Sequence, residues 1–379
     1  MNAIRVLALP LLSLLLLGWR EPLSVQGVDQ ATLTEILHDM PKTEIHTHIE
    51  GAVRPETILE LAPDYQVTLP ANTVDGLKSH IQMRPGETLL DFLKKFDCFR
   101  FVFDHPESLR RISYELVEDT ARENVIYTEL RINPIKHPEL LSVDGVLDAV
   151  IEGMDQACRD LQVEAGLIVS INRSYSVESA MQVAQAAVAR MDRGVIGLDL
   201  AGDEAHHPVE KFKAVFDYAQ AHHLHITIHA GEAAGPQSMA GAVEVCHAER
   251  IGHGVRLSED PVLERMFQRR KIPLEMCPNS NLLINVVKDL PSYPLARYYH
   301  AGIPVTLNTD DRHIFDINLT GEYVAMARHN GLTLAELEDI SLTGARVSFL
   351  PAARKAALIR RMEKRMAEFE ARWRARLGR

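Results

Sequence analysis

Two histidines stand two residues apart near the start of the chain, in the stretch TEIHTHIEG at residues 43–51. If this stretch is a strand, His46 and His48 project from one side of it, because alternate residues of a strand share a face. Two imidazoles placed together can hold a metal ion. The same spacing also fits two surface histidines in a chain that contains 17. The rest of the sequence has to distinguish these two interpretations.

Further residues of the same chemical kind follow other apolar runs. His229 ends one run and Glu232 follows it by three residues, His253 ends another run, and Asp310 with Asp311 ends a third. Each residue alone fits a hydrogen-bonded histidine, a helix-capping acid or a turn. Three imidazoles and one carboxylate, however, form a donor set that suits zinc and leaves one coordination position for water.

The elements that must position these residues alternate regularly. Short apolar runs of strand composition are separated by stretches with apolar residues at three- and four-residue intervals. Eight such pairs in order predict a (β/α)8 TIM barrel. An open doubly wound sheet alternates in the same way but usually has fewer strands, and no GxGxxG follows the first run. The expected strands are 43–51, 125–134, 164–173, 194–204, 224–232, 250–255, 272–281 and 303–311, and the expected helices include 108–123, 143–160, 177–193, 208–223, 236–248 and 259–270.

A barrel would bring the candidate residues together, because the carboxyl ends of its strands meet at one mouth. Four of the eight runs, with the first histidine pair included, carry these His, Asp or Glu residues at or near their ends. The pair at the opening of the chain is therefore interpreted as half of a metal site. Two-metal hydrolases of this architecture often bridge their ions with a modified lysine on the fourth strand. GVIGLDLAGDE (194–204) has no lysine, which favours one ion per chain.

The sequence outside the eight units suggests the domain organisation. Residues 28–379 are expected to form a single domain, with a helical insertion at about 52–124 and C-terminal helices at 333–379. The insertion includes the aromatic amphipathic stretch LLDFLKKFDCFRFVF (89–103). An insertion after the first strand lies over the mouth of a barrel, so it could form a lid, although such a stretch also fits ordinary core packing.

The first 27 residues are expected to be a signal peptide. Arg5 precedes the apolar run VLALPLLSLLLLG (6–18), which is short for a membrane span and fits a signal core, with cleavage after Gly27. This interpretation predicts a periplasmic or secreted protein with no stable membrane association after signal removal. The alternative is an over-called start codon, with a cytoplasmic protein beginning near VDQATLTEIL.

Charge and cysteine content exclude several classes of partner and site. The formal net charge of −11 argues against nucleic acid and anionic membrane surfaces as partners. The four cysteines lie far apart without a CxxC pair, so neither a disulfide framework nor a zinc knuckle is indicated. The sequence does not predict an oligomeric state.

Seven motifs in this order resemble those of the adenosine deaminase family of the metal-dependent amidohydrolase superfamily. The resemblance runs from about Thr43 to Glu322–Tyr323 and is weaker in the C-terminal helices. The motifs are EIHTHIEGAVRPETILEL, YTELRINP, LDLAGDE, HAGEAAGP, ERIGHGV, CPNSN and LNTDD.

The resemblance implies a role for each matching residue. It implies that zinc, one ion per chain, is bound by His46, His48, His229 and Asp310. It further implies that Glu232 is the proton donor and that His253 and Asp311 handle the attacking water and the ring, with substrate contacts from His48, Glu50, Gly202 and Asp311.

Two departures bear on the substrate. Glu50 stands where true adenosine deaminases usually have aspartate near the ribose, and Arg312–His313 stands where proline commonly follows NTDD. The expected reaction is hydrolytic deamination of adenosine and 2′-deoxyadenosine, small-molecule purine nucleosides, to inosine and deoxyinosine. Deamination of adenine or of a modified adenosine is the alternative.

The chemistry is coherent on physical grounds. Zinc lowers the pKa of bound water from 15.7 to about 7. Attack on the amine-bearing carbon breaks purine aromaticity unless a ring nitrogen is protonated, and Glu232 with a raised pKa could supply that proton. His253 could take or hold the water proton. Two other classes remain open: a metallohydrolase that cleaves an amide or ester, and a non-catalytic secreted binding protein.

Overall fold

The structure, a computed structural model, describes residues 23, 25, 27–84, 86–87, 89–134 and 141–378. The expected signal segment therefore lies almost entirely outside the described residues. Among the described residues, no helix combines the length and apolar character that crossing a bilayer requires.

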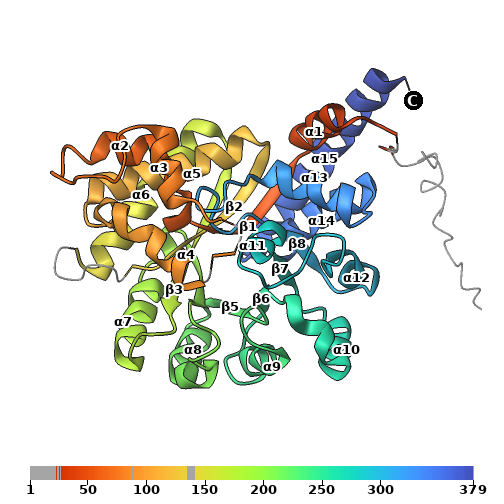
Figure 1. Cartoon of the computed structure of the whole chain (residues 1–379). Coiled ribbons are helices and arrows are strands. Elements are labelled where there is room, and N and C mark those ends of the chain that lie inside the picture. The colour runs from red at the N-terminus through yellow and green to blue at the C-terminus, as the bar shows by residue number, and fades with distance from the viewer. Residues whose placement is uncertain are drawn as a thin grey trace, which may run out of the picture.

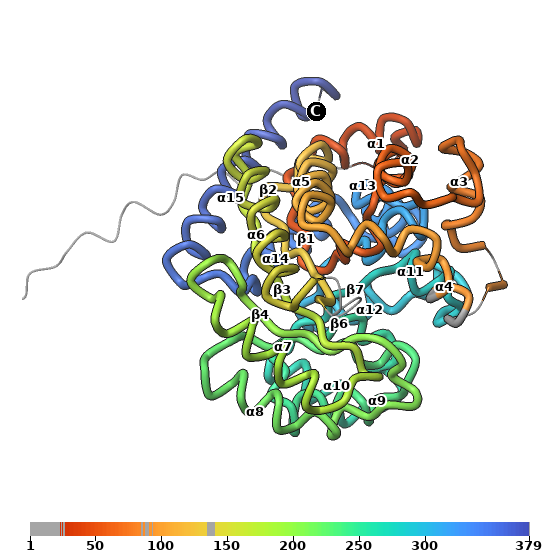
Figure 2. The backbone as a smooth tube through the Cα atoms, turned by 90° about the vertical axis from the view of Figure 1, so that its left-hand side faces the viewer, coloured from red at the N-terminus to blue at the C-terminus, as the bar shows by residue number. Residues whose placement is uncertain are grey.

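Eight parallel strands form one sheet in the order β1 to β8, so each strand pairs with its neighbours in sequence. Figures 1 and 2 show the strands at the centre with helices around them. The predicted (β/α)8 barrel is confirmed. The strands are β1 (Lys42–His48), β2 (Val125–Ile132), β3 (Glu164–Asn172), β4 (Val195–Ala201), β5 (His225–Ala230), β6 (Arg250–His253), β7 (Leu274–Met276) and β8 (Val305–Leu307).

The observed strands are shorter than the apolar runs that predicted them. The run at 272–281 contains a strand of three residues, because Pro278 occupies the first turn of a new helix, α11 (Pro278–Leu283). The run at 303–311 likewise contains β8 and a loop. In both cases the residues after the strand form the rim of the mouth.

The helices that follow the strands cover the outside of the barrel. Each turns its apolar side to the sheet, which explains why parallel strands such as β2 are buried along their whole length. They are α5 (Pro106–Arg122), α6 (Val143–Leu161), α7 (Val177–Val188), α8 (Lys213–Ala221), α9 (Pro236–Glu244), α10 (Pro261–Arg270), α12 (Leu295–His300), α13 (Leu319–His329) and α14 (Leu334–Val347).

The segment between β1 and β2 is helical before α5 begins. It contains α2 (Pro55–Leu61), α3 (Val74–Ile81), α4 (Leu89–Lys95) and the 3-10 helix η2 (Phe96–Phe103). The aromatic stretch at 89–103 is thus divided between α4 and η2, with non-helical backbone at Phe99. Figure 1 shows this segment, in orange, beside the strands.

The first and last described helices lie side by side. Asp39, at the end of α1 (Gln30–Asp39), accepts hydrogen bonds from Arg372 at 2.7 Å and from the Trp373 indole at 2.8 Å, both on α15 (Ala352–Leu377). A further ion pair joins Glu35 and Arg376 at 2.7 Å. Figure 2 shows both helices at the same end of the molecule.

β1 and β8 close the barrel through main-chain contacts beyond the end of β8. The N–H of His48 donates to the carbonyl of Asp310 at 2.8 Å, and the N–H of Asp310 donates to the carbonyl of His46 at 3.0 Å. The side chain of Asn308 accepts from the N–H of Ile45 at 3.0 Å. Residues of the predicted metal site therefore form part of this seam.

Candidate active site

A cavity of about 400 Å³ opens at the carboxyl ends of the strands. Most of the predicted site residues line it: His48, Glu50, Gly202, His229, Glu232, His253, Asp310 and Asp311. His46 lies deeper and is fully buried. Aromatic rings of the helical insertion, from Phe92, Phe96 and Phe103, also line the cavity. The insertion therefore contributes to the wall of the mouth.

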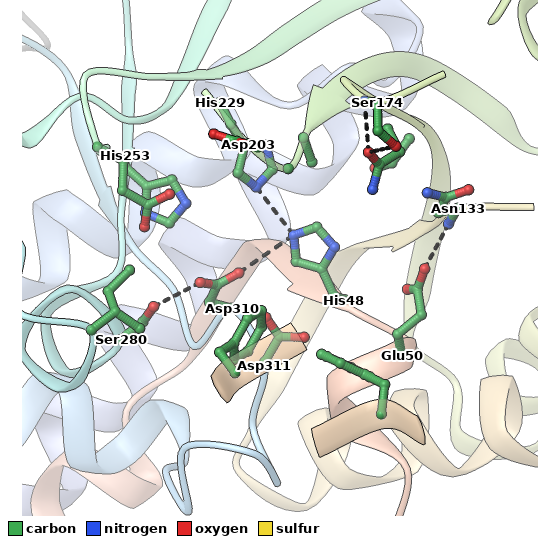
Figure 3. A pocket seen from close by; sticks show the side chains of 18 of the residues that line it. His48, Glu50, Asn133, Ser174, Asp203, His229, His253, Ser280, Asp310 and Asp311 are labelled. Atoms are coloured by element: carbon green, nitrogen blue, oxygen red, sulfur yellow. Dashed lines mark hydrogen bonds and ion pairs between the residues drawn. The ribbon is translucent and has the colours of Figure 1, made fainter. Parts of the chain in front are cut away.

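Three imidazole nitrogens and one carboxylate oxygen converge at the bottom of this cavity. Nε2 of His48 lies 3.2 Å from Nε2 of His229 and 3.4 Å from Oδ1 of Asp310 (Figure 3). Nε2 of His46 lies 3.4 Å from the same oxygen. That nitrogen is buried and makes no hydrogen bond to any described residue. Such a set of lone pairs directed at one another fits a divalent metal ion.

His253 also belongs to this cluster. One donor atom from each of His46, His229, His253 and Asp310 lies within 4.8 Å of the others. The structure thus brings together the four ligands implied by the family resemblance and one further imidazole. His253 also contacts Asn281 and Glu232, so we assign it a role other than metal binding.

Two buried carboxylates inside the barrel orient the rings of His46 and His229. Glu275 Oε2 lies 3.0 Å from Nδ1 of His46, and Asp199 Oδ1 lies 3.0 Å from Nδ1 of His229. A carboxylate accepts the Nδ1 proton and so leaves Nε2 of each neutral ring unprotonated, as a metal ligand must be. Sequence reasoning missed both acids. The feature of the sequence that could have identified them is a carboxylate inside an otherwise apolar strand.

Two arginines compensate the charge of these acids. Arg131 contacts Glu275 and lies 3.2 Å from Asp199, and Arg250 bonds Glu275 at 2.7 Å and Glu129 at 2.5 Å. Burial alone would favour the neutral acids. Arg131 and Arg250 outweigh it and hold the pKa of Glu275 well below its usual range. The barrel interior therefore keeps Glu275 ionised beside His46.

The loop after β5 carries Glu232 into the cavity. Glu204 accepts the N–H groups of Gly231 at 2.7 Å, Glu232 at 3.1 Å and Ala234 at 2.9 Å, so one carboxylate fixes the whole loop. The side chain of Glu232 keeps 18% of its surface exposed. Burial, with Asp310 and Glu204 nearby, raises the pKa of Glu232 well above its usual range. The site therefore favours the protonated form of Glu232.

Two residues of the site adopt left-handed backbone conformations at strand ends. His253 has φ 64° and Asp310 has φ 66°. Such angles are uncommon for residues other than glycine, and they gather at functional sites, where the surrounding fold holds them. Both side chains reach the cluster at the mouth from these positions.

The residues expected to meet the substrate line the same cavity. The N–H of Asn133 donates to Glu50 Oε1 at 2.8 Å, which holds that carboxylate at the rim (Figure 3). Gly51 approaches Asp311 so closely that a Cβ atom there would lie 1.9 Å from Oδ1 of Asp311. Gly202 has φ 102°, a conformation that favours glycine.

Arg312, the residue in place of the common proline, has a structural partner on each side. It bonds Glu44 at 3.0 Å and also contacts Glu123, all three being buried. These contacts tie the segment after Asp311 to β1 and to the end of α5. Arg312 therefore anchors the strand end that carries the two aspartates.

Comparisons with known proteins identify the family of this chain. The family model described as adenosine deaminase matches residues 41–365. A curated adenosine deaminase of Klebsiella pneumoniae is 40% identical over 328 residues, which cover 86% of this chain and 98% of that protein.

Solved structures of similar fold include enzymes with different substrates in their names. An adenine deaminase from Arthrobacter aurescens has a TM-score of 0.78 and 27% identity, covering 86% of this chain and 98% of that one. An Arabidopsis N6-mAMP deaminase also has a TM-score of 0.78, with 28% identity over 87% and 99%. An amidohydrolase from Burkholderia ambifaria with bound Zn has a TM-score of 0.82 and 26% identity over 93% and 98%.

Proposed function

This chain belongs to the adenosine deaminase family and is a hydrolytic deaminase, and we propose that its substrates are adenosine and 2′-deoxyadenosine, with inosine, deoxyinosine and ammonia as products. One observation supports this choice above others. The carboxyl group of Glu232, with its raised pKa, faces the same cavity as the cluster of His46, His48, His229 and Asp310. A proton donor beside a metal-binding cluster suits the deamination of a nitrogen heterocycle.

We propose one zinc ion per chain, held by His46, His48, His229 and Asp310. Three imidazoles and one carboxylate suit zinc, and the amidohydrolase from Burkholderia ambifaria carries bound Zn. When bound, zinc makes water a stronger nucleophile by lowering its pKa from 15.7 to about 7.

The chain's own residues then act on the purine ring. Glu232 donates its proton to the ring nitrogen next to the amine-bearing carbon, so that water adds at that carbon without leaving charge on the ring. Asp311 lines the same cavity and can accept the proton that is bound for the departing amine. The carbon–nitrogen bond breaks, ammonia leaves, the hydroxyl proton passes back to Glu232, and the water oxygen becomes the carbonyl oxygen of inosine.

Glu50 supports a nucleoside as the substrate. A carboxylate can accept a hydrogen bond from a ribose hydroxyl, whereas a phosphate in the same place would bring two anions together. Arg100, which also lines the cavity, is an opposing charge, but it is exposed to solvent, which weakens its pull on a phosphate. We therefore expect AMP to be a poor substrate.

Free adenine is the rival substrate, because Glu50 could fill the space that ribose leaves. The test is the ratio of kcat/KM for adenosine, adenine and AMP, measured by ammonia release, with Glu50→Asp beside the wild type. Higher kcat/KM for adenine than for adenosine would replace the proposed substrate and leave the deaminase intact. Higher kcat/KM for AMP than for both would mean that Glu50 does not meet the sugar.

The same panel separates the other two classes of function. A non-catalytic binding protein would release no ammonia from any amino-purine while still binding one. A metallohydrolase of amides or esters would hydrolyse those compounds instead. Since the acid, the imidazoles and the aspartates lie in one cavity, we expect turnover.

We further propose that the protein is exported, on the strength of Arg5 and the apolar run at 6–18. A scavenging enzyme outside the cytoplasm meets nucleosides from which phosphate has been removed. Mass spectrometry of the protein from its native cells tests this idea. A mature chain that begins near residue 28 is expected after export, and an intact N-terminus in the cytoplasmic fraction would contradict it.

A further inference from the structure

Asn281 lies beside the candidate active site, and the proposed reaction gives it no role. It is fully buried on α11. Its N–H donates to the carbonyl of Cys277 at 3.0 Å, and its carbonyl accepts from the N–H groups of Val286 at 2.9 Å and Val287 at 3.2 Å. The backbone at this position is therefore held from both directions.

The side-chain amide of Asn281 joins two residues of the site. Nδ2 donates to Oε1 of Glu232 at 3.0 Å and lies 3.1 Å from Nδ1 of His253. The third side of this triangle, from Oε1 of Glu232 to Nδ1 of His253, measures 3.3 Å. An amide nitrogen carries two hydrogens, so it can donate to the oxygen and to the ring nitrogen at once.

Tyr293 decides which end of the amide faces the site. Its hydroxyl donates to Oδ1 of Asn281 at 2.9 Å. With Oδ1 engaged by Tyr293, Nδ2 must face Glu232 and His253. Tyr293 is buried, so water does not compete for this contact.

The orientation of the amide sets the tautomer of His253. If Nδ1 accepts a hydrogen bond from Nδ2, it carries no proton, and the proton of the neutral ring lies on Nε2. A proton on Nδ1 would instead point toward the hydrogens of the amide, with only Oε1 of Glu232, which already accepts from Nδ2, at 3.3 Å to receive it.

We propose that Asn281, oriented by Tyr293, is a positioning residue of the deamination site that holds the Glu232 carboxyl group and keeps the proton of His253 on Nε2. The inference rests on the proposed function for its catalytic meaning, but the tautomer is a property of the chain itself. It narrows the role of His253. A ring with its proton on Nε2 donates a hydrogen bond to the reacting oxygen and does not act as a base toward water.

The test compares two substitutions at one position in the zinc-loaded enzyme. Asn281→Asp keeps the shape and the contact with Tyr293 but turns a donor into an acceptor, so the proton of His253 should move to Nδ1. Asn281→Ala removes the contact without reversing it. Asn279→Ala is the matched control, because Asn279 lies on the same helix and bonds Glu322 at 2.7 Å instead of Glu232.

The first readout is the pair of ring 15N resonances of His253, assigned by their absence in His253→Gln. We expect a protonated Nε2 in the wild type and in Asn279→Ala, and a protonated Nδ1 in Asn281→Asp. The second readout is steady-state kinetics with adenosine at equal zinc content. We expect kcat to fall about 100-fold or more in Asn281→Asp and about tenfold in Asn281→Ala, with KM within about threefold in both.

Three results would overturn the proposal. They are a wild-type His253 with its proton on Nδ1, unchanged ring resonances in Asn281→Asp, and an equal fall of kcat in Asn279→Ala, which would assign the effect to the stability of α11. The wild-type spectrum decides the tautomer even if a variant fails to fold. Failure of the proposed function would appear separately, as a wild-type enzyme with the expected spectrum that releases no ammonia from adenosine.

Discussion

The donor atoms of the candidate metal site come from residues whose orientation is set by their neighbours. Glu275 and Asp199 hold His46 and His229 by Nδ1, and the hydroxyl of Ser280 donates to Oδ2 of Asp310 at 2.8 Å. These partners fix the rotamers of the ligand side chains, so the donor atoms stay directed at one another. Such partners commonly contribute 10- to 100-fold to metal affinity.

Removal of one ligand should remove the ion. We expect His46→Ala and His229→Ala to lose bound zinc together with activity, because each leaves three of four ligands. Elemental analysis of purified protein measures this, with His225→Ala, a half-buried histidine on the same strand as His229, as the control. Two ions per wild-type chain, or activity without any, would contradict a single-zinc site.

Glu232→Gln should separate binding from chemistry. The amide has the shape of the acid but cannot deliver its proton, so kcat should fall by about 10²- to 10⁴-fold while zinc content and substrate binding persist. Titration calorimetry with adenosine and metal analysis check the two properties that should remain. A near-normal kcat would mean that another group protonates the ring.

Gly51→Ala tests the contact with Asp311 without changing any reacting group. The new Cβ atom would overlap the carboxylate of Asp311, which must move away from the cavity. A shift of about 1 Å in an active site can cost about 100-fold in rate, so we expect a loss of that order in kcat/KM. Unchanged kcat/KM in a folded variant would show that the position of Asp311 is not critical.

Short loops and the first turns of the helices that follow the strands position most of the candidate catalytic side chains. α11 is such an element, since it carries Ser280 toward Asp310 and Asn281 toward Glu232. α13 holds α11 in turn, because buried Glu322 accepts from the N–H of Asn279 at 3.2 Å and from its side chain at 2.7 Å.

Glu322 should make stability depend on pH. Burial raises the pKa of Glu322 from 4.5 to about 8. Between these values the unfolded chain has lost the proton and the folded chain keeps it, so the free energy of unfolding falls as pH rises from 4.5 to 8. Denaturant titrations of the wild type and Glu322→Gln should therefore differ in slope over this range, with the steeper fall in the wild type. Parallel curves would mean that Glu322 is ionised throughout.

The sequence predicted the strands and the residues at their ends better than it predicted the support beneath them. Apolar runs ending in His229, His253 and Asp310 could be recognised because both signals are local. The partner of His46 could not, since Glu275 is 229 residues away and its contact depends on the register of the closed barrel. Asn281 was visible as a motif residue, but only its distances reveal what it holds.

Across the whole molecule, the metal site and the closure of the barrel use the same residues. His46, His48 and Asp310 make the main-chain contacts between β1 and the segment after β8. Anything that binds the folded state and not the unfolded state stabilises it by mass action. Occupancy of the site should therefore stabilise the seam.

Chelation should reveal this linkage. We expect zinc removal to lower Tm and to speed amide hydrogen exchange at His48 and Asp310 more than at β3, which pairs along its length with β2 and β4. Differential scanning calorimetry and exchange mass spectrometry with and without a chelator measure the two effects. Equal exchange at the seam and at β3 after chelation would show that the ion does not stabilise the closure.

The seam also sets the order of events while the chain is being made. Ile45 and Asn308, which meet across it, are 263 residues apart. At a synthesis rate of roughly 5–20 residues per second, β1 waits about 13 to 50 s before its partner exists. A nascent chain that already carries His46, His48 and His229 still lacks the carboxylate of Asp310. The four proposed zinc ligands therefore exist together only after nearly the whole barrel has been synthesised, so the complete candidate metal site is one of the last parts of the protein to form.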